Sequence, residues 1–252
     1  MDSLEAYERN YKRYQQLTQP QISAIKTRVS LFPHQQTSQI QADYQLTNTT
    51  DEDIKEIFIT SPKALQKISL KGAKLTLQDS DESWHVYLFT LKKPLLPGQV
   101  SNMSYQLQQS CHPRPNGSCC NQSDFEPRLG YLDSFEISCS QQRKIRGLPV
   151  KTQTPTTATS DVHLTKFEAI VSTSPDQTAT TSGQLLSHWK KHGRCYFHYL
   201  MPNNTARNTT YFSAHSEQGT NESRKWRSIF NSAGEFLTES LTKTLNVFRR
   251  SS

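Results

Sequence analysis

The chain has 252 residues, a mean hydropathy of −0.73 and a hydrophobic content of 33%. These values are low for a compact domain, but they suffice for a β-rich core in which alternate positions face water. The length suits one large domain or two small ones. The net charge of +7 comes from Lys and Arg residues that are dispersed along the chain. Dispersed charge favours a solvated surface and argues against nucleic-acid binding, which needs clustered basic residues.

No apolar run approaches the roughly 18 residues of a membrane-spanning helix, and the acidic, polar start is unlike a secretory signal peptide. We therefore expect a soluble product or a piece cut from a larger protein. A secreted glycoprotein would use some of the Asn-x-Ser/Thr sequons, although a chain rich in Ser, Thr and Asn also forms sequons by chance. The seven sequons begin at Asn48, Asn102, Asn116, Asn121, Asn203, Asn208 and Asn221.

The first predicted element is a helix over residues 2–17. Leu4, Tyr7, Tyr11 and Tyr14 follow helical spacing, and Pro20 ends the pattern. We assign residues 1–18 to this N-terminal helix.

From residue 21 the hydrophobic period changes to two. Alternation over residues 25–31 and again over 40–46 predicts a hairpin with one wet face. Apolar residues on both sides of Lys71-Gly72-Ala73 predict a second hairpin over residues 68–77. Further strands follow up to residue 107, with a strong turn signal at Pro97-Gly98. The regular spacing predicts a mainly β fold, an antiparallel β-sandwich or a curved, saddle-like sheet.

Residues 109–160 interrupt this pattern as an irregular insertion, which ends in a Thr-rich linker. Strands resume at about residue 163, and residues 165–199 read as strand, turn, strand, turn, strand. We assign residues 19–218 to the β domain. Residues 219–252 predict an amphipathic helical tail, because Phe230, Leu237, Leu241 and Leu245 share one helical face. This helix would pack on its own domain or rest on a membrane surface.

One pair of histidines approaches a zinc-peptidase motif. His188 and His192 have the i, i+4 spacing of His-Glu-x-x-His, but the Glu is absent and Lys190 and Lys191 occupy the gap. Two ammonium groups beside a metal are unfavourable, and Gly193 indicates a turn. We therefore expect no metal site here.

Four of the five cysteines form a second metal candidate. Their spacing lacks the paired Cys-x-x-Cys knuckles of structural zinc sites, so loop disulfides and inert thiols remain as alternatives to zinc. The four are Cys111, Cys119, Cys120 and Cys139; the fifth is Cys195.

The chain contains neither a Gly-x-Ser-x-Gly elbow nor a Gly-rich phosphate loop. Asp79, Asp81 and Glu82 cluster in one polar turn, which favours a solvated loop over paired acid and base catalysis. We assign no catalytic, cofactor-binding or metal-binding residue.

Several segments, in collinear order over residues 5–215, resemble the N-terminal region of aminopeptidase N-like zinc metallopeptidases, in particular those joined to an ABC-transporter-type permease region. The segments are residues 7–14, 19–22, 40–53, 91–98, 129–131, 143–149 and 167–199. The resemblance implies a curved β domain that covers a separate thermolysin-like domain, which holds the zinc. The zinc motif and the Gly-x-Met-x-Asn motif of that second domain do not occur in this chain, so no catalytic residue is carried over.

Two functions follow from these observations. The first is a non-catalytic β domain of an aminopeptidase N-like protein, which packs on a catalytic domain or shapes access to it. The alternative is a stand-alone extracytoplasmic protein-binding module with no peptidase connection. Expected partners are a catalytic peptidase domain or a membrane permease component. A peptide is a further candidate partner. The resemblance implies an extracytoplasmic or membrane-associated location, and the oligomeric state is left open.

Overall fold

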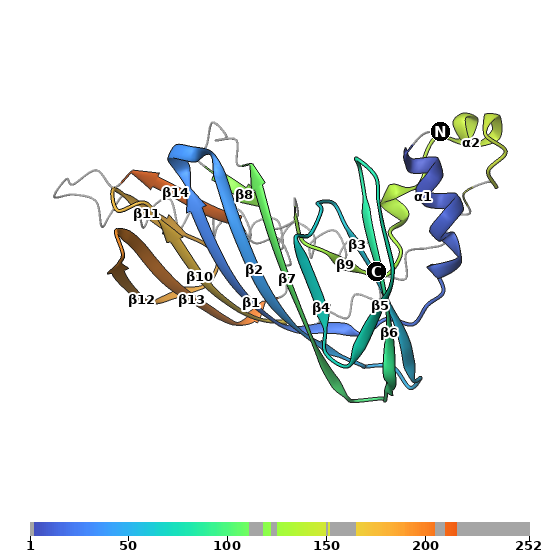
Figure 1. Ribbon diagram of the computed structural model, residues 1–252, viewed down its shortest axis with the longest axis horizontal. Helices are drawn as coiled ribbons and strands as arrows, with labels where there is room; N and C mark the ends of the chain where they lie inside the picture. Colours follow the sequence, from blue (N-terminus) through green and yellow to red (C-terminus); the bar gives the residue numbers. More distant parts are fainter. Residues whose placement is uncertain are drawn as a thin grey trace, which may run out of the picture. The chain divides into compact units, whose positions relative to one another are not determined.

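The computed structural model describes residues 3–110, 118–121, 125–149, 151, 165–204 and 210–215 (Figure 1). The chain divides into two compact units, residues 1–214 and 215–252. The predicted tail helix of residues 219–252 and the Thr-rich linker lie outside the described residues. Strands dominate the described part, so the prediction of a mainly β fold is confirmed. Within this part, no helix has the length and apolar character needed to cross a membrane.

A short helix opens the structure. Helix α1 (Ser3–Tyr11) is followed by one 3-10 turn, η1 (Lys12–Tyr14), so the predicted helix is present but ends earlier than residue 17. The helical spacing of the tyrosines places them on one buried face, where Tyr7 and Tyr11 pack among Phe58, Trp84 and other apolar side chains. The indole Nε1 of Trp84 donates a hydrogen bond to the backbone oxygen of Ser3, at 2.9 Å.

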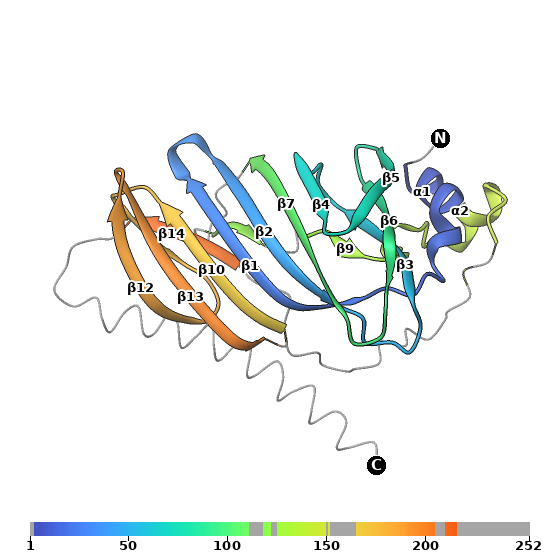
Figure 2. The same ribbon diagram turned by 60° about the horizontal axis from the view of Figure 1, so that its bottom comes forward.

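The largest sheet has seven strands, which Figure 2 shows side by side. In spatial order they are β12 (Gln184–Lys191), β13 (Arg194–Asn204), β10 (Thr165–Thr173), β1 (Gln21–Phe32), β2 (Thr37–Thr47), β7 (Val100–Ser110) and β4 (Lys67–Leu70). The predicted hairpin of β1 and β2 is confirmed, with the 3-10 turn η2 (Pro33–Gln35) between them. The pairing of β1 with β10 is parallel, whereas the other described pairs of this sheet are antiparallel, as predicted. A short hairpin turn would force an antiparallel pair, whereas β10 follows β1 after a long connection.

Two smaller sheets complete the described structure. The four-stranded sheet contains β5 (Ala73–Ser80), β6 (His85–Leu95), β3 (Ile54–Ser61) and β9 (Arg128–Leu129). The three-stranded sheet contains β11 (Gln177–Thr180), β14 (Thr210–His215) and β8 (Ser118–Asn121). The predicted irregular insertion also contains a 3-10 turn, η4 (Asp133–Phe135), and helix α2 (Ser140–Ile145), which was not predicted.

The predicted hairpin over residues 68–77 is wrong, because β4 and β5 belong to different sheets. The turn at Lys71 and Gly72 carries the chain from one sheet to the other. The amide of Lys71 donates to the carbonyl of Asn102 beside β4, while the carbonyl of Gly72 accepts from the amide of Lys92 beside β5. Alternation along each strand predicts a wet and a buried face but does not say which strand is its neighbour.

The main core lies on one face of the seven-stranded sheet and continues onto β3 and β6 of the four-stranded sheet. Alternate residues of β1, β2, β10 and β7, such as Val29, Ile40, Phe167 and Met103, are almost completely buried. The residues between them form the opposite face, which we call the outer face. Its side chains are mostly polar and charged, as the alternation predicts.

Candidate functional site

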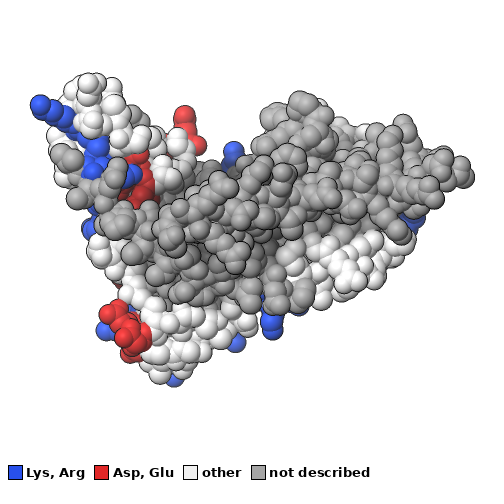
Figure 3. All heavy atoms as spheres, turned by 180° about the vertical axis from the view of Figure 1, so that it is seen from behind, with Lys and Arg blue, Asp and Glu red and all other residues white. Residues whose placement is uncertain are grey.

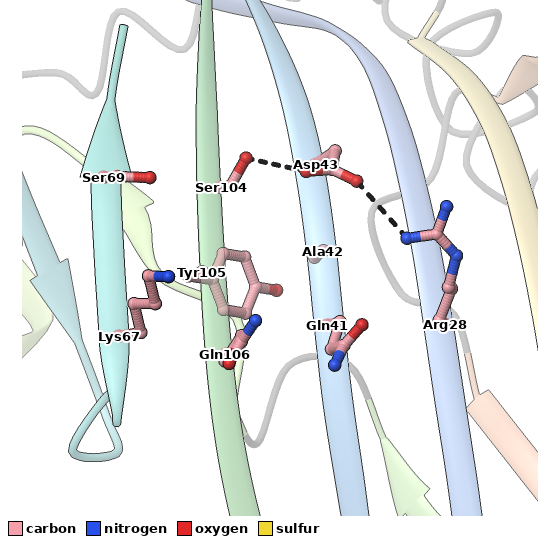
Figure 4. Close-up of a pocket in the computed structure, with 9 residues that line it drawn as sticks. All are labelled: Arg28, Gln41, Ala42, Asp43, Lys67, Ser69, Ser104, Tyr105 and Gln106. Atoms are coloured by element: carbon pink, nitrogen blue, oxygen red, sulfur yellow. Dashed lines mark hydrogen bonds and ion pairs between the residues drawn. The ribbon is translucent and has the colours of Figure 1, made fainter.

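The strand register places four polar residues of the outer face in one row across four strands. Lys67 on β4 is the partner of Gln106 on β7, Gln106 of Gln41 on β2, and Gln41 of Arg28 on β1. Figure 4 shows the four side chains at one level of the sheet. We call this set the Lys67–Arg28 row. Since neighbouring strands lie about 4.8 Å apart, its two cationic ends are separated by about 14 Å at the backbone.

A hollow of about 290 Å³ lies over this row. It is lined by Arg28, Gln41, Ala42, Asp43, Lys67, Ser69, Ser104, Tyr105 and Gln106. Ala42 and Tyr105 are buried, and their side chains belong to the core alternation, so the lining that faces outward is polar. The hollow is therefore suited to a polar ligand.

One carboxylate lies in the hollow. Oδ1 of Asp43 accepts a hydrogen bond from Oγ of Ser104 at 2.7 Å, and Oδ2 lies 3.9 Å from Nη1 of Arg28 (Figure 4). Both members of the ion pair are more than half exposed, so their attraction is weak. Lys67 makes no ion pair with any of the described residues. The hollow therefore offers more hydrogen-bond donors than acceptors.

A second charged group extends the outer face towards β13. Nζ of Lys26 lies 2.8 Å from Oε2 of Glu168, and Nε2 of His198 lies 3.2 Å from Oε1. The hydrogen bond from Lys26 lowers the pKa of Glu168, which keeps the carboxylate charged. On the described strands β1, β2, β4, β7 and β10, the outer face carries Lys26, Arg28, Lys67 and Lys166 against Asp43 and Glu168. This part of the sheet is therefore net positive.

All eight residues of the edge strand β12 are exposed. Among the described strands it has a partner on one side only, β13. Leu185, Leu186 and Trp189 are 44%, 49% and 37% exposed, and we call these three residues the β12 edge. The Trp189 ring stacks on Tyr196 with centroids 5.4 Å apart. An exposed apolar edge strand is a surface on which another chain can pack.

A buried ion pair fixes α1 to α2. Arg143 donates two hydrogen bonds to the carboxylate of Glu8, and each side chain is 3% exposed. The hydrogen bond to Glu8 raises the pKa of Arg143. Lys12 binds Glu136 beside this pair. Figure 3, a view from behind, shows acidic and basic side chains together at this end of the described structure.

A buried carboxylate lies in the main core. Glu126 is 4% exposed and accepts a hydrogen bond from the Tyr44 hydroxyl at 2.8 Å, while the hydroxyls of Tyr44 and Tyr105 are 3.0 Å apart. Burial raises the pKa of both tyrosines, so they remain protonated donors. The sequence analysis identified neither this group nor the Arg143–Glu8 pair, because both connect residues that are far apart in the chain.

The two histidines lie on a strand and on the turn that follows it, not on a helix. His188 is on β12 and stacks on Phe197, while His192 follows β12 with a left-handed φ of 48°. Four residues along a strand span roughly 13 Å, so the two rings are not placed to share one ion as they would be on a helix. Among the described residues, no three His, Cys, Asp or Glu side chains are grouped so as to bind a metal.

The structure describes two of the five cysteine side chains. Cys139 is an exposed free thiol before α2, and Cys195 is a buried free thiol on β13. Cys119 and Cys120 lie on β8, but their side chains, like the whole of Cys111, fall outside the described residues. The choice between disulfides, inert thiols and zinc therefore stays a prediction.

The three acidic residues predicted to share one polar turn are divided in the structure, with Asp79 at the end of β5 and Asp81 and Glu82 in the turn after it. Asp79 accepts a hydrogen bond from the Tyr11 hydroxyl, and Asp81 accepts one from Oγ of Ser3. The hydrogen bond from Ser3 lowers the pKa of Asp81. The end of β5 and the turn after it therefore hold both ends of α1.

No protein-family model and no curated protein matches the chain. Solved structures of M1 zinc metallopeptidases are similar to it over 78% of its length. A mutant of the enzyme from Deinococcus radiodurans has a TM-score of 0.47 and 13% identity, and the unmutated enzyme has 0.46 and 12%. A two-domain M1 zinc metallopeptidase mutant bound to L-tryptophan has 0.47 and 11%. The chain spans 42–44% of the length of these enzymes. At these values the similarity defines neither a family nor an activity for the chain.

Proposed function

We propose that this chain is a non-catalytic β domain of an aminopeptidase N-like zinc metallopeptidase, and that it packs on a catalytic domain or shapes access to it. The observation that carries the proposal is the β12 edge. A chain that works alone usually protects a sheet edge, and Lys190 and Lys191 do so at one end of β12, whereas Leu185, Leu186 and Trp189 leave apolar side chains exposed along the rest of it. A second domain would cover these side chains.

The resemblance of the sequence supports the peptidase part of the proposal, since the similar segments follow one another in order from residue 5 to 215. In that family the N-terminal β domain carries no zinc ligand, and the hydrolytic groups belong to the following domain. The partner is therefore a polypeptide that contains His-Glu-x-x-His.

The test begins with the coding sequence that follows codon 252 in the source genome. We expect it to encode a His-Glu-x-x-His segment, and the corresponding polypeptide should co-purify with this chain. Leu186→Ser should reduce co-purification. Leu96→Ser is the matched control, because Leu96 is 43% exposed but lies after β6, away from β12 in the sheet order. Equal loss with both variants, or a neighbouring sequence without the motif, would contradict the proposal.

The second arm is an assay with aminoacyl 4-nitroanilide substrates and added zinc. The isolated chain should show no turnover. Turnover that a chelator abolishes would overturn the non-catalytic assignment.

A further inference from the structure

We propose that the Lys67–Arg28 row binds an acidic peptide in an extended conformation, with two carboxylates four residues apart. This binding site is separate from the β12 edge and does not depend on the proposed peptidase function. Its occupant is defined by the charge of the row, by its length and by the amides at its centre.

The length of the row matches an extended peptide. Three strand spacings separate Lys67 from Arg28 by about 14 Å at the backbone. An extended peptide rises about 3.4 Å per residue, so the side chains at positions i and i+4 are separated by about 13.6 Å and point to the same side. Two acidic side chains with this spacing can meet Lys67 and Arg28 at the same time.

The charge of the row favours an anionic ligand. Lys67 has no carboxylate partner within the described structure, and Arg28 has only a long, exposed contact with Asp43. The other outer-face cations of β1 and β10, Lys26 and Lys166, add to the positive potential, although Lys26 is partly neutralised by Glu168. An acidic peptide would therefore bind more strongly at low ionic strength.

The centre of the row favours a peptide over an acidic glycan. Gln41 and Gln106 each carry a donor and an acceptor in an amide, which is the same pair of groups that a peptide bond presents. A sugar ring packs best on an exposed aromatic face, but the only aromatic lining residue is Tyr105, which is 1% exposed. The described lining thus matches peptide groups and offers no platform for a sugar.

Substitution of Asp43 should strengthen peptide binding, whereas substitution of Lys67 or Arg28 should weaken it. Its carboxylate lies beside Arg28 in the hollow and repels an acidic ligand. Its backbone is in the next row along β2, so removing the charge leaves the Lys67–Arg28 row in place. Asp43→Asn should therefore tighten binding, which a general loss of structure would not do.

The experiment uses the full chain and a fluorescently labelled nine-residue peptide with glutamate at its third and seventh positions, Ala and Ser elsewhere and blocked ends. We expect a Kd below about 1 mM in low salt, measured by fluorescence anisotropy, and weaker binding as NaCl is added. Lys67→Gln and Arg28→Gln should each weaken binding about two- to fivefold, and Asp43→Asn should tighten it by a similar factor. Lys93→Gln is the control, because this exposed lysine makes the same charge change on β6 of the four-stranded sheet.

A second peptide of identical composition has its two glutamates at the third and fourth positions. It should bind at least twofold more weakly than the first peptide, because its carboxylates cannot reach both cations. Equal binding of the two peptides would overturn the spacing argument. Tighter binding of polygalacturonate or heparin than of the peptide would overturn the assignment to a peptide. An effect of Lys93→Gln equal to that of Lys67→Gln would show that net charge alone is responsible, and would also overturn the proposal.

Discussion

Arg143 and Glu8 form a buried, two-pronged ion pair that joins α2 to α1 across 135 residues of sequence. Nη1 of Arg143 donates to Oε2 of Glu8 at 2.9 Å, and Nη2 donates to Oε1 at 2.6 Å. The same guanidinium also donates to the carbonyls of Ile137 and Pro149, at 2.8 Å each. One side chain therefore holds α1, α2 and the segments on both sides of α2 together.

Removing the guanidinium should be costly, because it leaves the carboxylate of Glu8 buried without its charge partner. We expect Arg143→Met to lower the free energy of unfolding by about 3–5 kcal/mol. The double variant Arg143→Met with Glu8→Leu should lose less than the single variant, since no buried charge then remains. Arg9→Met removes an exposed ion pair with Glu5 and one exposed hydrogen bond to the carbonyl of Arg146, so as the control it should cost no more than about 1 kcal/mol. Urea unfolding followed by circular dichroism measures all three, and equal losses for Arg143→Met and Arg9→Met would contradict the prediction.

Acid should weaken the attachment of the N-terminal region through Glu136. Burial raises the pKa of this carboxyl, but Lys12, Lys151 and Tyr131 outweigh burial and hold the pKa below its ordinary value of 4.5. The folded state then binds the proton less tightly than the unfolded state. The contribution of Glu136 is complete above about pH 4.5 and is lost as the pH falls through the lower, folded-state pKa.

The measurement is the free energy of unfolding between pH 7 and pH 3. Glu136→Gln should flatten the acid limb of this profile, whereas Glu82→Gln, in the exposed turn after β5, should leave it unchanged. A wild-type profile that Glu136→Gln does not alter would show that this carboxyl contributes nothing to acid sensitivity.

Two glycines with positive φ should respond differently to substitution. Gly183 has a φ of 102°, and an added Cβ would lie 2.8 Å from the backbone oxygen of Leu200, which cannot move without disturbing β13. Gly193 has a φ of 68° and open space around it. We expect Gly193→Ala to cost about 1 kcal/mol and Gly183→Ala about 2 kcal/mol or more, because the contact adds to the conformational cost. Thermal unfolding compares them, and equal melting temperatures for the two variants would rule out the contact.

The hydroxyl of Tyr44 should matter more than an ordinary tyrosine hydroxyl. It donates to the buried carboxylate of Glu126 and also contacts the hydroxyl of Tyr105. Tyr44→Phe should lower the free energy of unfolding by about 1–3 kcal/mol, since a buried carboxylate loses one of its donors. Tyr196→Phe, on the outer face, should cost less than about 0.5 kcal/mol. If Tyr44→Phe has no larger effect than Tyr196→Phe, the network does not stabilise the core.

Much of the fold could be predicted from short-range pattern. Alternation identified β1, β2, β7 and β10 and the side of each strand that is buried, because a period of two follows directly from strand geometry. The tyrosines of α1 also lie where helical spacing puts them. These features depend only on residues close together in the chain.

The errors concern partners, which local pattern does not specify. The alternation of residues 68–77 is equally satisfied by one hairpin or by two strands in different sheets, and the structure has the second arrangement. The parallel pair of β1 and β10 is joined by a long connection, which local pattern does not describe. Helix α2 has only six, mostly polar, residues, so its sequence shows no helical period. The Lys67–Arg28 row could not be identified either, because its members come from four strands and only the register aligns them.

The parallel pairing of β1 and β10 also determines when the large sheet can be completed during translation. Ser30 and Ser172, hydrogen-bonded across this pair, are 142 residues apart in sequence. At roughly 5–20 residues per second, a ribosome needs on the order of ten seconds to deliver the second strand after the first. During that interval the edge of β1 that will pair with β10 has no partner strand. A chaperone that covers this edge would protect the unfinished protein from self-association.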